Sequence, residues 1–150
     1  MDTNKYITNA FQSLKTRIKK NEGYSNKPYK DQLGYDTIGY GHLIKPHELK
    51  YFKKKLTREY FTDLFEQDFA KAHNDYKKNF YKTRHSSKDK ELLIEMIFQM
   101  GKSRVLKFKK MHFHLNSNNK YMVCLEMMDS LWYKQTPERV NDLIKNYLGK

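Results

Sequence analysis

The spacing of apolar residues along the chain predicts a mostly helical protein. Over residues 3–20, apolar side chains recur every three or four positions, which places them on one helical face; they are Ile7, Phe11, Leu14 and Ile18. The same period returns after Thr57, a candidate N-cap residue. It predicts a long helix whose apolar stripe consists of Phe61, Leu64, Phe65, Phe69, Ala72 and Tyr76.

The second half of the chain also has a helical period. Residues 90–100 are apolar almost all round, which predicts a central, buried helix that ends at Gly101. We expect two short helices over 104–131, with a break at the NSNN stretch, residues 116–119. Thr136 followed by Pro137 is a strong helix start. The final apolar stripe consists of Val140, Leu143, Ile144, Tyr147 and Leu148.

Residues 24–44 have a different pattern, because three glycines interrupt any helix and the intervening Tyr, Thr and Ile favour strands. They predict a small antiparallel sheet with a tight turn near DQLG, residues 31–34, and Pro46 closes the region. The chain of 150 residues has no internal repeat and suits one domain. The predicted fold class is therefore α+β, mostly helical, with one small N-terminal antiparallel sheet.

Composition adds a strong basic charge and a packed core to this picture. The formal net charge is +13, which attracts polyanions such as nucleic acid, anionic lipid or an anionic cell wall. The 12 Tyr and 9 Phe argue against disorder. Cys124 is the single cysteine, so no internal disulfide can form, and we expect it to be a small buried hydrophobe. Neither a membrane span nor a secretory signal is predicted, so we expect synthesis in the cytoplasm.

The stretch from residue 21 to residue 44 carries the candidate chemistry. Cleavage of a glycosidic bond needs an acid for the leaving oxygen and a second carboxylate for water or the sugar cation, and Glu22 and Asp31 supply two carboxyl groups. The Thr37 hydroxyl can hold a water at a fixed angle. Gly39 and Gly41 allow a backbone to approach a ligand closely.

Each of these residues also has an ordinary structural interpretation. Glu22 can be a solvated surface residue, and Asp31 can belong to an Asx-turn. Thr37 suits a strand, and His42 can be a hydrogen-bonded structural histidine. Spacing and composition alone therefore leave both interpretations open.

The order of residues in this stretch resembles the phage lysozymes of the T-even type, which are muramidases of glycoside hydrolase family 24. The shared pattern, E-G-x5-Y-x-D-x2-G-x2-T-I-G-x-G-H, runs from Glu22 to His42. Two later segments are similar to the family in the same order, EMIFQMG at 95–101 and LWYKQTPERV at 131–140. A weaker similarity covers LTREYFTDLFEQD, residues 56–68.

The resemblance implies a lysozyme-like fold with two lobes and a cleft between them. The N-terminal lobe would span about residues 21–56 and the connecting helix about 57–80. A helical C-terminal lobe would span about 88–150, with helix 3–20 packed on it. The stretch from His42 to Thr57 looks shorter than in the T-even enzymes, which implies a smaller N-terminal lobe.

The resemblance also implies roles for individual residues. Glu22 matches the catalytic general acid, Asp31 the second carboxylate, and Thr37 a residue that helps to position the attacking water. The implied mechanism inverts configuration, so the two carboxyl groups should lie roughly 6.5–9.5 Å apart. Further matched positions line the saccharide cleft or support the site; they are Leu43, Phe98, Gln99, Arg139 and His42.

The implied activity is an endo-acting muramidase that cuts the β-1,4 bond between N-acetylmuramic acid and N-acetylglucosamine in peptidoglycan. We expect a monomer that needs no cofactor and no metal, binds no specific nucleic acid, and reaches the wall through a holin or lysis. Two rivals remain open. One is a non-catalytic wall-binding module. The other is a basic nucleic-acid-binding protein, for which basic and aromatic residues alternate at 50–56, 75–85 and 107–115.

Overall fold

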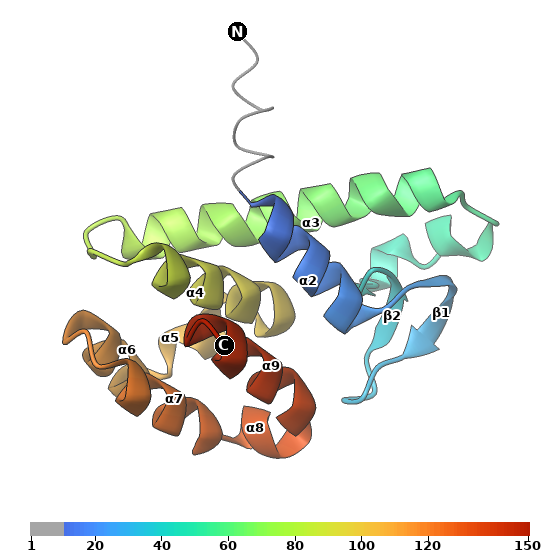
Figure 1. Cartoon of the computed structure of the whole chain (residues 1–150). Helices are drawn as coiled ribbons and strands as arrows, with labels where there is room; N and C mark the ends of the chain where they lie inside the picture. The colour runs from blue at the N-terminus through green and yellow to red at the C-terminus, as the bar shows by residue number, and fades with distance from the viewer. Residues whose placement is uncertain (1–10) are drawn as a thin grey trace, which may run out of the picture. The chain divides into compact units, whose positions relative to one another are not determined.

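Figure 1 shows the computed structural model, which describes residues 11–150 as a set of helices and one small sheet. This arrangement confirms the predicted α+β, mostly helical class. The three strands are β1 (Ser25–Lys30), β2 (Asp36–Gly39) and β3 (His42–Leu43). The helices are α2 (Gln12–Glu22), α3 (Arg58–Phe80), α4 (Ser87–Met100), α5 (Lys102–Leu106), α6 (Lys109–Asn116), α7 (Lys120–Met128), α8 (Leu131–Gln135) and α9 (Pro137–Tyr147).

The chain divides into two compact units, and the boundary falls inside α3. The first unit ends at Ala70, and the second extends from Lys71 to Lys150. The first contains α2, the sheet and the start of α3, whereas the second is wholly helical. The lobe boundaries implied by the resemblance, and the packing of helix 3–20 on the C-terminal lobe, stay predictions.

Helix α2 confirms the predicted apolar stripe over its described part. Leu14 and Ile18 are fully buried, whereas Ile7 and the N-terminal part of the expected helix lie outside the described residues. The helix extends to Glu22, two residues beyond the predicted end. Gly23 then stops it with a positive φ of 72° and donates its backbone N–H to the Lys19 carbonyl at 3.0 Å.

The sheet is antiparallel in the order β1-β2-β3. Its turn lies where the sequence predicted it, because Gly34 N donates to the Asp31 carbonyl at 3.0 Å. One face of β2 contributes Ile38 to a core that also contains Phe52 and Phe61. The sheet is therefore held against the start of α3.

Helix α3 begins as predicted, because Thr57 Oγ1 accepts a hydrogen bond from Tyr60 N at 3.1 Å. Its apolar stripe is confirmed, and the buried members are Phe61, Phe65, Phe69, Ala72 and Tyr76. The stripe passes from the first unit into the second, so one continuous helix contributes to both cores.

Helix α4 is the predicted central helix of the second unit, with six consecutive buried residues from Leu92 to Ile97. It begins at Ser87 rather than at residue 90, because Ser86 and Asp89 form a reciprocal capping box. Tyr147 of α9 donates to Asp89 Oδ1 at 2.7 Å, which ties the start of α4 to the end of α9. Gly101 ends the helix as predicted.

The prediction of two helices over 104–131 is wrong, because the structure has α5, α6 and α7 there. The additional helix, α5, is a single short turn that the apolar period did not reveal, and fully buried Val105 anchors it. The break near NSNN is confirmed, since Asn118 has a φ of 56° and Asn119 caps α7. Cys124 is buried as expected. Among the described helices, none has the length and apolar content to cross a membrane.

Candidate active site

Glu22 is the last residue of α2, where the chain leaves the helix for the sheet. Its half-buried side chain lies against Gly41, and a Cβ atom there would fall 2.8 Å from Glu22 Cδ. Gly41 also has a φ of 78°, which favours glycine. The close approach predicted for this glycine is therefore made by a carboxylate of the protein itself. Gly39 likewise leaves room for the Phe61 ring.

Asp31 lies directly after β1, and its carboxylate is oriented by the turn that follows. Its Oδ1 accepts hydrogen bonds from Leu33 N at 2.9 Å and from Tyr35 N at 2.8 Å. This is the Asx-turn that the sequence left open as the ordinary interpretation. The turn does not exclude chemistry, because both bonds use the same oxygen and Oδ2 takes no part in them.

Thr37 lies on β2 and is only 3% exposed. Its Oγ1 donates a hydrogen bond to the Tyr35 carbonyl at 2.9 Å. The same residue, Tyr35, therefore binds Asp31 through its N–H and Thr37 through its carbonyl. Because the hydroxyl proton is engaged, the Thr37 oxygen offers its lone pairs as a hydrogen-bond acceptor.

Tyr29 joins these residues, although the sequence analysis quoted it in the motif without giving it a role. It pairs with Thr37 across the strands and precedes Asp31 by two positions. Because successive strand side chains alternate between faces, Tyr29, Asp31 and Thr37 belong to one face. Lys30 and Asp36 pair on the opposite face, with Nζ and Oδ1 2.7 Å apart.

The pKa of the Tyr29 hydroxyl responds to both candidate carboxylates. Burial raises the pKa of the Tyr29 hydroxyl, and the charges of Glu22 and then Asp31 raise it further. Both carboxylates therefore lie within electrostatic reach of the same hydroxyl. Strand alternation around Asp31 is the sequence signal that would have identified Tyr29.

His42 confirms the expectation of a hydrogen-bonded histidine beside the site. Its Nδ1 lies 2.8 Å from Asp68 Oδ2, and its Nε2 lies 3.1 Å from Glu48 Oε2. Burial alone would lower the pKa of His42, but the two carboxylates outweigh it and raise the pKa. His42 thus links β3 to α3 and to the turn at Glu48. The next residue, Leu43, pairs with Thr37 and is 50% exposed.

The remaining candidate residues belong to the second unit. Phe98 and Gln99 are half-buried in the last turn of α4, and Trp132 Nε1 donates to Gln99 Oε1 at 3.0 Å. Arg139 of α9 places its Nε 3.7 Å from Oε2 of Glu95, which is fully buried. Sequence reasoning missed Glu95 as a partner of Arg139. The supporting role that the resemblance implies for Arg139 stays a prediction.

A metal centre finds no support in the described residues, where no group of three or more His, Cys, Asp or Glu side chains could hold an ion. The His112 ring is engaged elsewhere, since its Nε2 lies 2.8 Å from the Val105 carbonyl. The chemistry available at the sheet is therefore that of two carboxylates, a tyrosine and a threonine hydroxyl.

The sequence matches a family model, described as phage lysozyme, over residues 19–146. Probable T4-type lysozyme 1 of Dictyostelium discoideum is 34% identical over 157 residues, which covers 88% of this chain and 91% of that protein. Probable T4-type lysozyme 2 of the same organism is 33% identical over 156 residues, with the same coverage. The pre-baseplate central spike protein Gp5 of Enterobacteria phage T4 is 30% identical over 161 residues, covering 89% of this chain but 27% of that protein.

Proposed function

Because the chain belongs to the phage lysozyme family, we propose that it hydrolyses the β-1,4 bond between N-acetylmuramic acid and N-acetylglucosamine in peptidoglycan. Family membership over residues 19–146 makes the protein a lysozyme-type glycoside hydrolase. The matched range includes Glu22, Asp31 and Thr37. The bond that is cut and the roles of these residues are the content of the proposal.

Glu22 is the general acid of the proposed reaction. It transfers its proton to the glycosidic oxygen as the bond between that oxygen and the anomeric carbon breaks. Its place at the end of α2 and against Gly41 holds the carboxyl group in one region of the first unit. A group that donates a proton to a defined oxygen needs such a fixed position, because proton transfer requires hydrogen-bond distance.

Asp31 and Thr37 position the attacking water. The water donates one hydrogen bond to the Asp31 carboxylate and one to Thr37 Oγ1, whose own proton is engaged by the Tyr35 carbonyl. One lone pair of the water oxygen is then directed at the anomeric carbon, and Asp31 accepts the proton that the water loses. Attack from the face opposite the leaving group inverts the configuration, for which the two carboxyl groups should lie roughly 6.5–9.5 Å apart.

The observation that carries the proposal is the match to the phage lysozyme family over residues 19–146. The influence of both Glu22 and Asp31 on the Tyr29 hydroxyl supports the two carboxylate roles, because glycosidic cleavage needs two carboxyl groups near one bond. Leu43, Phe98 and Gln99 are proposed to contact the sugars. Arg139 and His42 are proposed to support the site, and we expect a monomer that reaches the wall through a holin or lysis.

The test measures reducing ends released from purified peptidoglycan by the wild type and by three single variants. Glu22→Gln keeps the shape of the side chain but removes the acid proton, so we expect a loss of about 100-fold or more. Asp31→Asn should cost a similar factor. Asp36→Asn is the matched control, because it removes a carboxylate from the other face of the same sheet, and we expect a change within about twofold.

Three results would contradict the proposal or revive a rival. If wild type and Glu22→Gln release equal amounts of reducing muramic acid, Glu22 is not the acid. If neither releases fragments but both bind the wall, the protein is a wall-binding module. A salt-sensitive shift of DNA without any lysis would favour the nucleic-acid-binding alternative.

A further inference from the structure

The chain between β3 and α3 forms two 3-10 turns, Pro46–Glu48 and Tyr51–Lys53, whose inward side chains recur every fourth residue. Phe52 is 5% exposed and packs with Ile38 and Phe61 in the core of the first unit. Leu56 packs against the same cluster. These contacts give the turns one fixed orientation on the unit that carries Glu22 and Asp31.

The acidic residue of this stretch is also directed inward. Glu48 is the only Asp or Glu between Lys45 and Arg58. Its Oε1 accepts a hydrogen bond from Lys45 N at 3.0 Å, and its Oε2 lies 3.1 Å from His42 Nε2. Its negative charge is therefore matched by His42, and among the lysines of this stretch it acts on Lys45.

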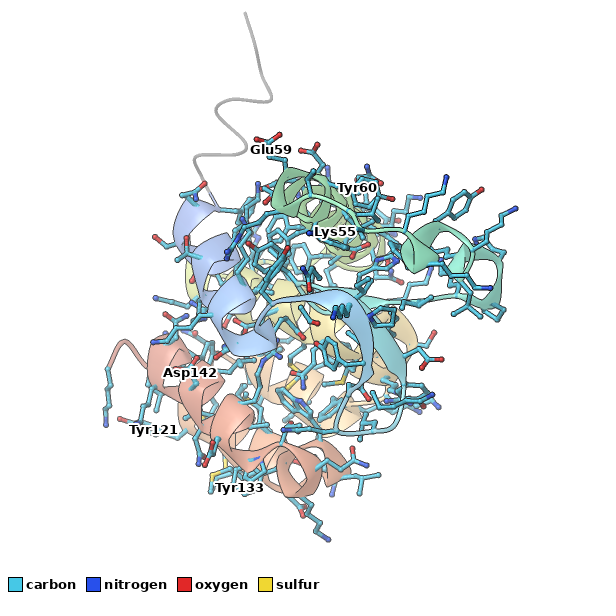
Figure 2. The ribbon with its side chains drawn as sticks, turned by 90° about the vertical axis from the view of Figure 1, so that its right-hand side faces the viewer. Lys55, Glu59, Tyr60, Tyr121, Tyr133 and Asp142 are labelled. Carbon is cyan, nitrogen blue, oxygen red and sulfur yellow. The ribbon has the colours of Figure 1, made fainter. Side chains whose placement is uncertain are left out.

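Five of the nine exposed residues between positions 45 and 55 are lysines. We define the basic segment as five exposed lysines within eleven residues: Lys45, Lys50, Lys53, Lys54 and Lys55. Figure 2 shows side chains extending away from the teal turns between β3 and α3, and it labels Lys55 at the end of the segment. Leu49 and Tyr51 are exposed among the lysines, at 46% and 55%.

We infer that the basic segment is an accessory surface that binds the carboxylates of peptidoglycan stem peptides, an inference that rests on the proposed function. A lysine ammonium is a point charge without strict directional demands, so it suits carboxylates on flexible peptides. Each exposed pair contributes little by itself, because solvent screens it. Stem peptides recur along a glycan strand, so several weak pairs form on one polymer and reinforce one another.

The geometry of the aromatic residues argues against single-stranded nucleic acid as the partner. Binding of that kind uses exposed aromatic faces on which bases stack. In this segment Phe52 is buried, and the Lys50 ammonium lies 5.2 Å from the Tyr51 ring centroid, over its face. The segment therefore offers five lysines but a single exposed Phe, Tyr or Trp ring, that of Tyr51, which has a lysine over one face.

The test compares two variants that each lose four positive charges. K50Q/K53Q/K54Q/K55Q neutralises the basic segment, whereas K102Q/K107Q/K109Q/K110Q neutralises four exposed lysines in the second unit. Each is prepared in a Glu22→Gln background, and co-sedimentation with purified sacculi freed of phosphate polymers measures binding. The sacculi are used untreated and after carbodiimide amidation of their carboxylates. Matching far-UV circular dichroism and thermal melting show that both variants fold.

We expect the first variant to bind untreated sacculi about tenfold more weakly than its parent, and the second within about threefold. Amidated sacculi should bind the parent as weakly as untreated sacculi bind the first variant. Equal losses in the two variants would overturn the inference, because net charge alone would then explain binding. Unchanged binding after amidation would overturn it as well, because carboxylates would not be the partner.

Two readouts separate this inference from the proposed function. Release of reducing ends by the wild-type protein tests the enzyme, whereas co-sedimentation tests the surface. Suppose that the wild type releases fragments and that the first variant binds sacculi as strongly as its parent. The inference would then be wrong, whereas the proposed enzymatic activity would be supported. A DNA gel shift that the first variant alone loses, with sacculus binding retained, would assign the segment to nucleic acid and overturn the inference.

Discussion

His42 in the first unit has a carboxylate at each ring nitrogen, whereas His85 and His112 in the second unit face a hydroxyl and a carbonyl. The His42 nitrogens lie 2.8 Å from Asp68 Oδ2 and 3.1 Å from Glu48 Oε2. A neutral imidazole can donate from only one nitrogen, so both contacts are satisfied only when the ring is protonated. The first unit therefore favours a charged histidine.

The second unit favours neutral histidines. The Tyr76 hydroxyl lies 2.8 Å from His85 Nδ1, and burial followed by Asp89 raises the pKa of Tyr76 to about 12, so this hydroxyl keeps its proton and donates it. His112 Nε2 donates to the Val105 carbonyl at 2.8 Å. Burial is the largest cause and lowers the pKa of both histidines. For His85, the charge of Asp89 opposes this effect, and the neighbouring His112 and Lys90 add to it.

The two units therefore contribute to stability with opposite pH dependence. The raised pKa of His42 means that its contribution is fully present below its ordinary value of 6.5. That contribution is lost as the pH rises through the folded-state pKa. The lowered pKa values of His85 and His112 mean that their contribution is present above 6.5 and is lost as the pH falls.

The two units also differ in how much solvent reaches the carboxylates of their ion pairs. In the first unit, Lys15 lies 2.6 Å from Glu66, whose side chain is 41% exposed. In the second, Glu95 beside Arg139 has no exposed surface at all. A charge that keeps contact with water survives the loss of its partner far better than a buried one. The second unit should therefore depend more strongly on charge pairing.

The largest expected effect comes from Arg139→Met. It leaves Glu95 buried without its cation, so we expect a loss of about 3–5 kcal/mol in the free energy of unfolding at pH 8. Urea unfolding followed by the fluorescence of Trp132, the single tryptophan, measures the second unit.

Lys15→Met is the matched control in the first unit. It should cost about 1 kcal/mol, because Glu66 remains solvated and the cation–π contact with the Phe69 ring is lost together with the ion pair. Its stability is measured by urea unfolding followed by far-UV circular dichroism. Equal costs for Arg139→Met and Lys15→Met would refute the difference between the units.

A smaller effect is expected from His42→Gln. At pH 6 the variant loses two charge-assisted hydrogen bonds, and we expect about 1–2 kcal/mol, reduced by the partial exposure of both carboxylates. The ring loses its proton as the pH rises through its raised pKa, so the cost should be smaller at pH 9 than at pH 6. Chemical denaturation of both proteins at the two pH values measures the difference. A larger cost at pH 9 would show that His42 is held in its neutral form.

The smallest effect is expected from the double variant H85Q/H112Q. Both proteins lose stability in acid for other reasons, but only the wild type must also protonate these two rings. The stability difference between wild type and variant should therefore narrow by up to about 1 kcal/mol between pH 7.5 and pH 5. Thermal melts across this range measure it. A difference that widens in acid would contradict the neutral assignment.

Much of the fold was predictable because it follows from local chemistry. The stripe of α3, its cap at Thr57 and the stop at Gly101 depend on residues close in sequence. Helix α5 was not predicted, because a helix of one turn is too short to show an apolar period. The candidate site was predictable to the extent that Glu22, Asp31 and Thr37 belong to a recognisable motif.

Other features depended on partners far apart in sequence. No local pattern indicated that His42 would bind Asp68, that Arg139 would lie beside Glu95, or that Lys15 would be buried against Glu66. These pairs determine which charges are neutralised inside the protein and which remain on its surface. The protonation preferences of the histidines follow from such contacts rather than from residue type.

The sequence by itself determined the helical period, the turns that need glycine and the set of groups available for acid–base chemistry, because these depend on residue type and short spacing. The tertiary structure decided that the Glu22 side chain packs against Gly41. It also decided that the charges of both candidate carboxylates raise the pKa of Tyr29. It also decided that Glu48 turns inward while the lysines around it face solvent. Those outcomes depend on which distant side chains meet, and electrostatic interactions depend on distance and burial.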